Sequence, residues 1–175
     1  FDPERMEQLV VSVLEHGILE PLLVRPLHDD EYELIAGERR LRAAREAGLT
    51  KVPVVVRDLD DQQALQVALI ENLQREDLNP VEETEAVLKL LSIVLSVSEK
   101  EVVSMLQQSH TARNRQQELP HNVMEQLEKI DEVLAGIGRF NADSFRANRL
   151  PLLGLPKDVL TVLREGKIAY TKALA

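Results

Sequence analysis

The chain has 175 residues, of which 44% are hydrophobic and 29% are charged, a composition typical of one ordinary or two small globular domains. Its net charge of −9 argues against a protein that coats nucleic acid indiscriminately, and an aromatic content of only 3% argues against single-strand binding by base stacking. The absence of cysteine excludes disulfides, thiolate metal sites and cysteine catalysis, and it favours a reducing cytoplasm.

The first 75 residues mix helical and strand patterns. Apolar spacing predicts, in chain order, a helix at 3–16, strands at 22–24 and 32–35 joined by a polar turn at 28–30, a helix at 38–47, a strand at 52–56 and a helix from about 60 to 75. Gly17 and Gly48 follow two of these helices and mark their ends. Asp60 or Asp61 is the expected N-cap of the last one.

From Pro80 onward only helical patterns recur. They predict helices at about 80–95, 98–107, 121–135, 143–150, 156–165 and from 170. Ser98 and Glu101 fit a capping box, and Pro156 suits a first helical turn. The expected fold class is therefore α+β, with a small α/β domain at 1–79 followed by an all-helical domain at 80–175.

Two local basic islands interrupt the acidic chain. Residues 36–51 carry five basic and two acidic side chains, and residues 136–175 carry seven basic and three acidic ones. This pattern predicts two separate anion-binding sites. No apolar run approaches the roughly 18–20 residues of a membrane helix and no signal peptide opens the chain, so no membrane partner is expected. Because the sequence starts at Phe1 without an initiator methionine, we expect a fragment of a longer protein.

The first island lies in a stretch, residues 35–44, that runs from a strand through a glycine into a helix. A helix N-terminus exposes unpaired N–H groups and partial positive charge, so it attracts phosphate. Gly37 permits a close approach of the backbone, and Arg39 and Arg40 add charged donors that suit phosphate oxygens. Taken alone, the same residues fit an ordinary surface helix, with its arginines paired to nearby glutamates, equally well.

A second candidate segment, residues 71–80, combines acidic, amide and basic side chains at a predicted helix end. Glu71 and Arg75 share one helix face, which by itself indicates an ordinary ion pair. In the functional alternative, Glu71 and Asn72 supply oxygen ligands to Mg²⁺ on a triphosphate, while Arg75 contacts the phosphates. One or two protein ligands are enough for Mg²⁺ beside phosphate and water.

Together with the stretch before them, these segments resemble the signature boxes of ParB-like DNA partition proteins. The first box is similar to residues 15–22, the second to 35–44 and the third to 71–80. The resemblance extends from about residue 1 to 106 and again from 141 to 175. It implies a ParB/sulfiredoxin-like α/β N-terminal domain and a helix-turn-helix DNA-binding domain.

The resemblance further implies that the N-terminal domain binds CTP with Mg²⁺. Glu38 would sit by the γ-phosphate and assist slow hydrolysis. Many family members carry Gln where this chain has Glu20, and an ionised Glu can only accept, which suits the N4 donor of cytosine. The implied ligands are Gly37, Arg39, Arg40 and Arg75 for the phosphates, and Glu71 and Asn72 for the metal.

The helical half carries the second basic island and resembles a helix-turn-helix. Its first helix is expected at 97–106 and its recognition helix at 141–153, and since roughly three or four residues normally form the turn, 107–140 would be an insertion. Arg and Asn side chains can read guanine and adenine in the major groove. Without the resemblance, a solvated helix of mixed charge would be favoured. The candidate DNA-binding residues are Ser144, Arg146, Asn148 and Arg149.

Two features of this half depart from the family pattern. Pro151 stands where Arg is usual and removes a helix hydrogen bond, so the recognition helix is expected to be short or kinked. Within the insertion, apolar side chains recur at helical spacing from Val123 to Leu134, which predicts an amphipathic helix packed on the domain with its acidic face outward. A mobile acidic loop is the alternative. So long an insertion indicates a plasmid-type variant.

The expected function is that of a CTP-dependent, site-specific DNA-binding clamp for plasmid or chromosome partition, with slow CTP hydrolysis as its switch. It would bind double-stranded DNA at a centromere-like site, self-associate on nucleotide binding and act in the bacterial cytoplasm on a nucleoid or plasmid. A partition ATPase would contact a region that this fragment lacks.

Two enzymes built on the same fold are the alternatives. A small-molecule kinase would leave the basic helical half unexplained. A nuclease would need several carboxylates near a histidine, and no such cluster is evident in the sequence. A sulfiredoxin-like reaction requires the cysteine that this chain lacks.

Overall fold

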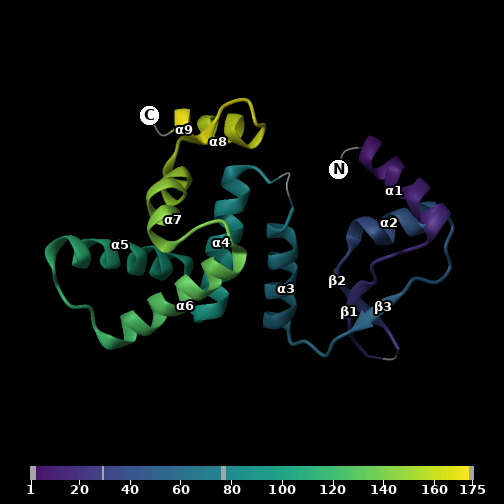
Figure 1. Cartoon of the computed structure of the whole chain (residues 1–175), viewed down its shortest axis with the longest axis horizontal. Helices are drawn as coiled ribbons and strands as arrows, with labels where there is room; N and C mark the ends of the chain where they lie inside the picture. Colours follow the sequence, from purple (N-terminus) through teal and green to yellow (C-terminus); the bar gives the residue numbers. More distant parts are fainter. Residues whose placement is uncertain (1–2, 29, 76–77, 174–175) are drawn as a thin grey trace. The chain divides into compact units, whose positions relative to one another are not determined.

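The computed structural model describes residues 3–28, 30–75 and 78–173, which form two compact units (Figure 1). The N-terminal unit is Phe1–Ala68 and the helical unit is Leu69–Ala175, so the division falls within helix α3 (Asp61–Leu73). The α+β class predicted from the sequence is confirmed. The domain boundary predicted at Asn79–Pro80 coincides with the cap of helix α4 and stays a prediction.

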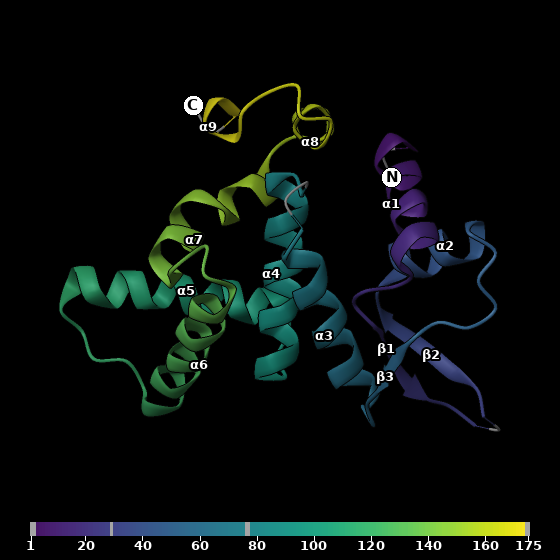
Figure 2. The same ribbon diagram turned by 45° about the vertical axis from the view of Figure 1, so that its right-hand side comes forward.

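The N-terminal unit contains a three-stranded sheet and two neighbouring helices. Its elements before α3 are α1 (Pro3–His16), β1 (Leu22–Pro26), β2 (Tyr32–Ala36), α2 (Glu38–Glu46) and β3 (Val54–Val56). The strand order is β2-β1-β3, with β2 antiparallel and β3 parallel to β1. Helices α1 and α2 lie side by side (Figures 1 and 2), and Met6, Val13 and Ala43 form their buried contact.

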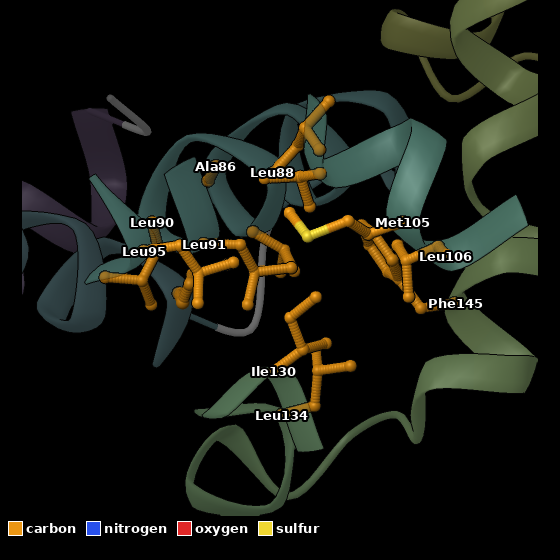
Figure 3. Close-up of a cluster of buried hydrophobic side chains, with 13 residues drawn as sticks. Ala86, Leu88, Leu90, Leu91, Leu95, Met105, Leu106, Ile130, Leu134 and Phe145 are labelled. Atoms are coloured by element: carbon orange, nitrogen blue, oxygen red, sulfur yellow. The ribbon is translucent and has the colours of Figure 1, made fainter. Parts of the chain in front are cut away.

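The helical unit follows the elements predicted from apolar spacing. Its elements after α3 are α4 (Pro80–Leu95), α5 (Glu99–Arg115), α6 (His121–Ile137), α7 (Ala142–Asn148), the 3-10 helix η1 (Leu150–Gly154), α8 (Lys157–Arg164) and α9 (Tyr170–Ala173). Side chains of α4, α5, α6 and α7 share one hydrophobic core, much of which Figure 3 displays. Across residues 3–28, 30–75 and 78–173, no helix is both long and apolar enough to span a bilayer.

Local capping explains where several helices begin. The Asn79 side chain accepts hydrogen bonds from the first turn of α4. Pro80 is the first residue of that helix, where its missing N–H costs no hydrogen bond. The predicted capping box of α5 is confirmed, since the Ser98 hydroxyl and the Glu101 carboxylate each bond the other residue's backbone N–H. Hydrogen bonds from the Ser98 side chain and backbone lower the pKa of Glu101. Pro156, predicted inside α8, instead has extended ψ and precedes it as the N-cap.

In the helix-turn-helix prediction, the end of the first helix was wrong and the short recognition helix is confirmed. Helix α5 continues to Arg115, so residues 107–115 extend the first helix and do not belong to the inserted turn; Ala112 anchors this extension by its burial. The recognition helix is short, as predicted, because α7 ends at Asn148 and the chain tightens into a 3-10 helix around Pro151.

Helix α6 confirms the predicted amphipathic helix in the inserted segment. Ile130 and Leu134 are completely buried in the core shared with α4, α5 and α7, and further apolar residues of the helix pack against it. Its acidic side chains are exposed. Those acidic residues are Glu125, Glu128, Asp131 and Glu132. The mobile-loop alternative is therefore excluded for the described part of the insertion.

The burial of Leu134 sets a stability test. Leu134→Ala should lower the free energy of unfolding by about 2–5 kcal/mol, because it removes buried methyl groups and leaves a cavity among α4, α5 and α7. Met124→Ala, on the same helix but 47% exposed, is the matched control and should cost less than about 1 kcal/mol. Urea denaturation of both variants measures the difference, and equal midpoints would contradict the docking of α6.

Candidate functional site

The first site residues gather where β2 turns into α2. Gly37 is the N-cap of α2 and has φ 103° and ψ 25°, a left-handed conformation that glycine adopts without strain. It is buried, and a Cβ there would lie 3.3 Å from the Leu22 side chain and 3.4 Å from the Arg40 guanidinium. No side chain caps α2, so its first N–H groups are left for another acceptor. This geometry suits a bound anion.

Arg40 ties this turn to the loop before β1. Its Nη1 donates to the backbone oxygens of Glu20 (2.8 Å) and Pro21 (3.0 Å) and lies 2.9 Å from the Glu20 carboxylate. Three of the predicted ligands, Glu20, Gly37 and Arg40, therefore lie together. The Glu20–Arg40 ion pair was not foreseen, because the two residues are 20 positions apart and only the hairpin brings them together.

The remaining candidates on α2 flank the same turn. Glu38 is the first residue of the helix and is exposed, while Arg39, the next residue, is partly buried. A carboxylate at this position lies near the positive end of the helix and would face any anion held there. The structure therefore places all four α2-turn candidates within one short stretch of backbone.

The third predicted box lies in the helical unit, at the end of α3. Glu71 is exposed and Asn72 is partly buried, with its Oδ1 3.5 Å from Nη1 of Arg75. Among the described residues, no group of three or more metal-ligating side chains occurs. A site with two protein ligands would still satisfy Mg²⁺ beside phosphate. The convergence of these residues with the α2 turn stays a prediction.

The four DNA-binding candidates occupy different environments. The Ser144 hydroxyl belongs to the capping box of α7, since it accepts from Asn141 N (3.1 Å). Asn148 is exposed, whereas Arg146 is partly buried and its Nε has no hydrogen-bond partner among the described atoms. Phe145, directly before Arg146, is fully buried and anchors the helix in the core. Arg146 and Asn148 thus follow the buried anchor of the helix within one turn.

Arg149 points into the helical unit. Its guanidinium lies over the rings of Phe140 and Tyr170, at 5.0 Å and 4.6 Å from their centroids, and Nη2 is 3.1 Å from a carboxylate oxygen of Glu83. Only 15% of its side chain is exposed. Sequence reasoning missed this cluster. A usable signal was that the Arg149 segment stands between two of the few aromatic residues in the chain.

Comparisons with known proteins agree with this architecture. A family model for the ParB N-terminal domain matches residues 1–73. A probable plasmid-partitioning protein ParB of Thermus thermophilus is 49% identical over 173 residues, which cover 98% of this chain and 57% of that protein. The chain thus spans little more than half the length of this curated relative.

One solved structure gives the same result. The C-terminally truncated chromosome-partitioning protein ParB of Caulobacter crescentus, complexed to the centromeric parS site, matches with a TM-score of 0.63 and 34% identity, over 99% of this chain and 73% of that one. The Caulobacter protein complexed with CTP-γ-S matches with a TM-score of 0.40 and 35% identity, over 99% and 79%. A helical unit behind a small α/β unit defines the class of protein. The chain belongs to the ParB family of partition proteins.

Proposed function

We propose that this chain is the nucleotide- and DNA-binding part of a partition protein, in which bound CTP and Mg²⁺ control the grip on a centromere-like DNA site. The observation that carries the proposal is the uncapped, glycine-led N-terminus of α2 in a chain that also carries a short, well-anchored reading helix. The first feature suits a phosphate chain and the second suits the major groove. A small-molecule kinase would use only the first.

The residues present fit a magnesium nucleotide. Gly37 permits the left-handed turn that opens α2, and the N–H groups at the start of α2 together with the Arg39 and Arg40 side chains would bind phosphate oxygens. Glu71 and Asn72 would hold Mg²⁺, which supplies charge neutralisation on the phosphates, and Arg75 would support them. Glu20, as an acceptor beside Arg40, would face the cytosine amino group.

On the DNA side, α7 would present its exposed face to the major groove. Asn148 and Arg146 are the base-reading candidates, while Ser144 would contribute mainly through the start of the helix, where its hydroxyl closes the cap. Arg149 would act from inside by fixing the end of the reading helix through Glu83. The Caulobacter relative was solved in complex with the centromeric parS site, which supports a DNA-binding role for this chain.

Gly37 is the most direct test of the nucleotide site. Gly37→Ala should weaken CTP binding by about tenfold or more, because an alanine strains the left-handed turn and its Cβ pushes against Leu22 and Arg40. Gly48→Ala is the matched control, since it is also left-handed but has nothing within 4 Å of the added Cβ. Calorimetric titration with CTP compares them, and equal losses would remove Gly37 from the site.

A clamp must also close around its DNA. We expect two copies of the chain to associate when CTP or a slowly hydrolysed analogue is added and to separate without nucleotide. Light scattering at one protein concentration measures this directly. The same mass in both states would contradict nucleotide-driven closure.

The decisive experiment combines both ligands. A duplex that the parent chain selects from a random-sequence pool should stimulate its CTP turnover, and a scrambled duplex of the same length and salt should not. Turnover of ATP in preference to CTP, or transfer of phosphate to a small molecule, would favour the kinase alternative. Cleavage of the duplex would favour the nuclease.

A further inference from the structure

A buried carboxylate joins the three functional segments of the helical unit. Glu83, in the first turn of α4, has a side chain only 8% exposed. One of its oxygens lies 2.8 Å from Arg139 Nη1 and the other 3.1 Å from Arg149 Nη2. A buried carboxylate shared by two arginines holds both at fixed positions, because without it two neighbouring positive charges would have no counter-charge.

Arg139 extends this contact to the predicted magnesium segment. While its Nη1 binds Glu83, its Nη2 donates to the backbone oxygen of Arg75 at 3.2 Å. The planar guanidinium offers these two donors in one rigid fork, which fixes the spacing between Arg75 and the start of α4. A movement of the backbone that carries Glu71 and Asn72 would therefore change the hydrogen bond between Arg75 and Arg139.

The other arm of the cluster reaches the reading helix. Arg149 caps the C-terminal end of α7 and is held between the rings of Phe140 and Tyr170. Phe140 follows Arg139 directly and also packs against Phe145, with ring centroids 5.8 Å apart. Any shift of Arg139 and Phe140 would thus change the contacts of two residues at α7, Phe145 and Arg149.

The cluster has room for a second arrangement. Arg139 and Arg149 bring two positive charges to one carboxylate, and Nη1 of Arg149 is buried without a hydrogen-bond partner among the described atoms. An unpaired buried donor is unfavourable, so an arrangement that pairs Nη1 of Arg149 would offset part of the cost of changing partners. The matching ion pair between Arg164 and Glu85, also on α4, is about half exposed and touches neither functional segment.

We propose that Arg139 and Glu83 are positioning residues that couple occupation of the Glu71–Arg75 segment by nucleotide to the setting of the DNA-reading helix α7. The inference rests on the proposed function and assigns a task to the inserted segment, whose last residues supply Arg139 and Phe140. A nucleotide that moves the Arg75 backbone would change the hydrogen bond between the Arg75 oxygen and Arg139. Because Glu83 binds both Arg139 and Arg149, a shift of Arg139 would then alter the position of Arg149.

The test is the ratio of DNA affinities with and without nucleotide. The full chain is titrated against its selected duplex, labelled for fluorescence anisotropy, in the presence and absence of a slowly hydrolysed CTP analogue. In the parent the two dissociation constants should differ by about fivefold or more. Arg139→Met should bring the ratio within about twofold of one, whereas the matched control Arg164→Met should keep the parent ratio.

Two further measurements separate coupling from folding. Arg139→Lys keeps the charge beside Glu83 but replaces two forked nitrogens by one, so it should unfold at the parent temperature and still lose the coupling. In the parent, the analogue should change hydrogen exchange of the amides of α7, and unchanged exchange would overturn the inference. A parent-like ratio in folded Arg139→Met would overturn it as well. Failure of the parent to bind CTP, seen by calorimetry, would instead remove the proposed function together with the coupling built on it.

Discussion

Glu38→Ala should leave CTP binding intact or slightly tighter and reduce CTP turnover by about 100-fold. Glu38 is exposed at the first position of α2, directly after the glycine turn that would hold the phosphates. A carboxylate beside a phosphate repels it, so removal of the carboxylate removes an unfavourable contribution to CTP affinity. An acid or base that moves a proton during hydrolysis contributes about 10²–10⁴-fold to the rate.

Calorimetry with CTP and a phosphate-release assay measure the two effects on the same protein. Glu46→Ala is the matched control, because Glu46 is an exposed glutamate at the opposite end of the same helix. It should change neither quantity. Turnover at the parent rate in Glu38→Ala would refute the hydrolytic role of Glu38, whatever the affinity.

Replacing residues 109–138 by a short turn should lower the midpoint of thermal unfolding by roughly 10 °C or more, because two fully buried side chains, Ile130 and Leu134, leave the core. The deletion also removes Arg113, which pairs with Asp143 in the first turn of α7 at 2.5 Å. Helix α7 would lose both its packing against α6 and its ion pair with Arg113. DNA affinity, measured at fixed salt below the new midpoint, should therefore fall by about 100-fold.

The control for the deletion keeps the α6 core and changes only its exposed acids. Glu125, Glu128 and Glu132 replaced together by glutamine should preserve the unfolding midpoint, and DNA affinity should stay the same or rise, because the net negative charge of the chain falls. If the deletion variant binds the selected duplex as tightly as the parent, the inserted segment has no part in DNA recognition.

Local signals in the sequence were sufficient for most of the fold. Glycine stops, the Ser98 capping box and apolar spacing predict elements that the structure contains at nearly the same bounds. The error at α5 has a simple cause. Nothing between residues 107 and 115 breaks a helix, and the prediction ended this helix where the family resemblance ended. Pro156 was misplaced by a single position, which capping statistics alone do not resolve.

The candidate sites were less accessible to sequence reasoning. The α2 turn could be predicted because its glycine and arginines are contiguous, and contiguous residues need no tertiary information. The partners of Arg149 could not, since Glu83 is far away in the sequence and Tyr170 comes from a separate helix. An arginine on a predicted recognition helix fits a groove contact and an internal ion pair equally well until the burial of its neighbours is known.

In the proposed function, the early end of α7 limits how much sequence one copy of the chain can read. Seven residues of helix extend about 10 Å, which matches the rise of about three base pairs of duplex. Three specified base pairs recur by chance about once in 64, so a single reading helix cannot single out one address among the roughly 10⁶ or more positions of a bacterial genome. Unique addressing then requires that two copies read together at a fixed spacing, and the information that selects the site resides in the pair.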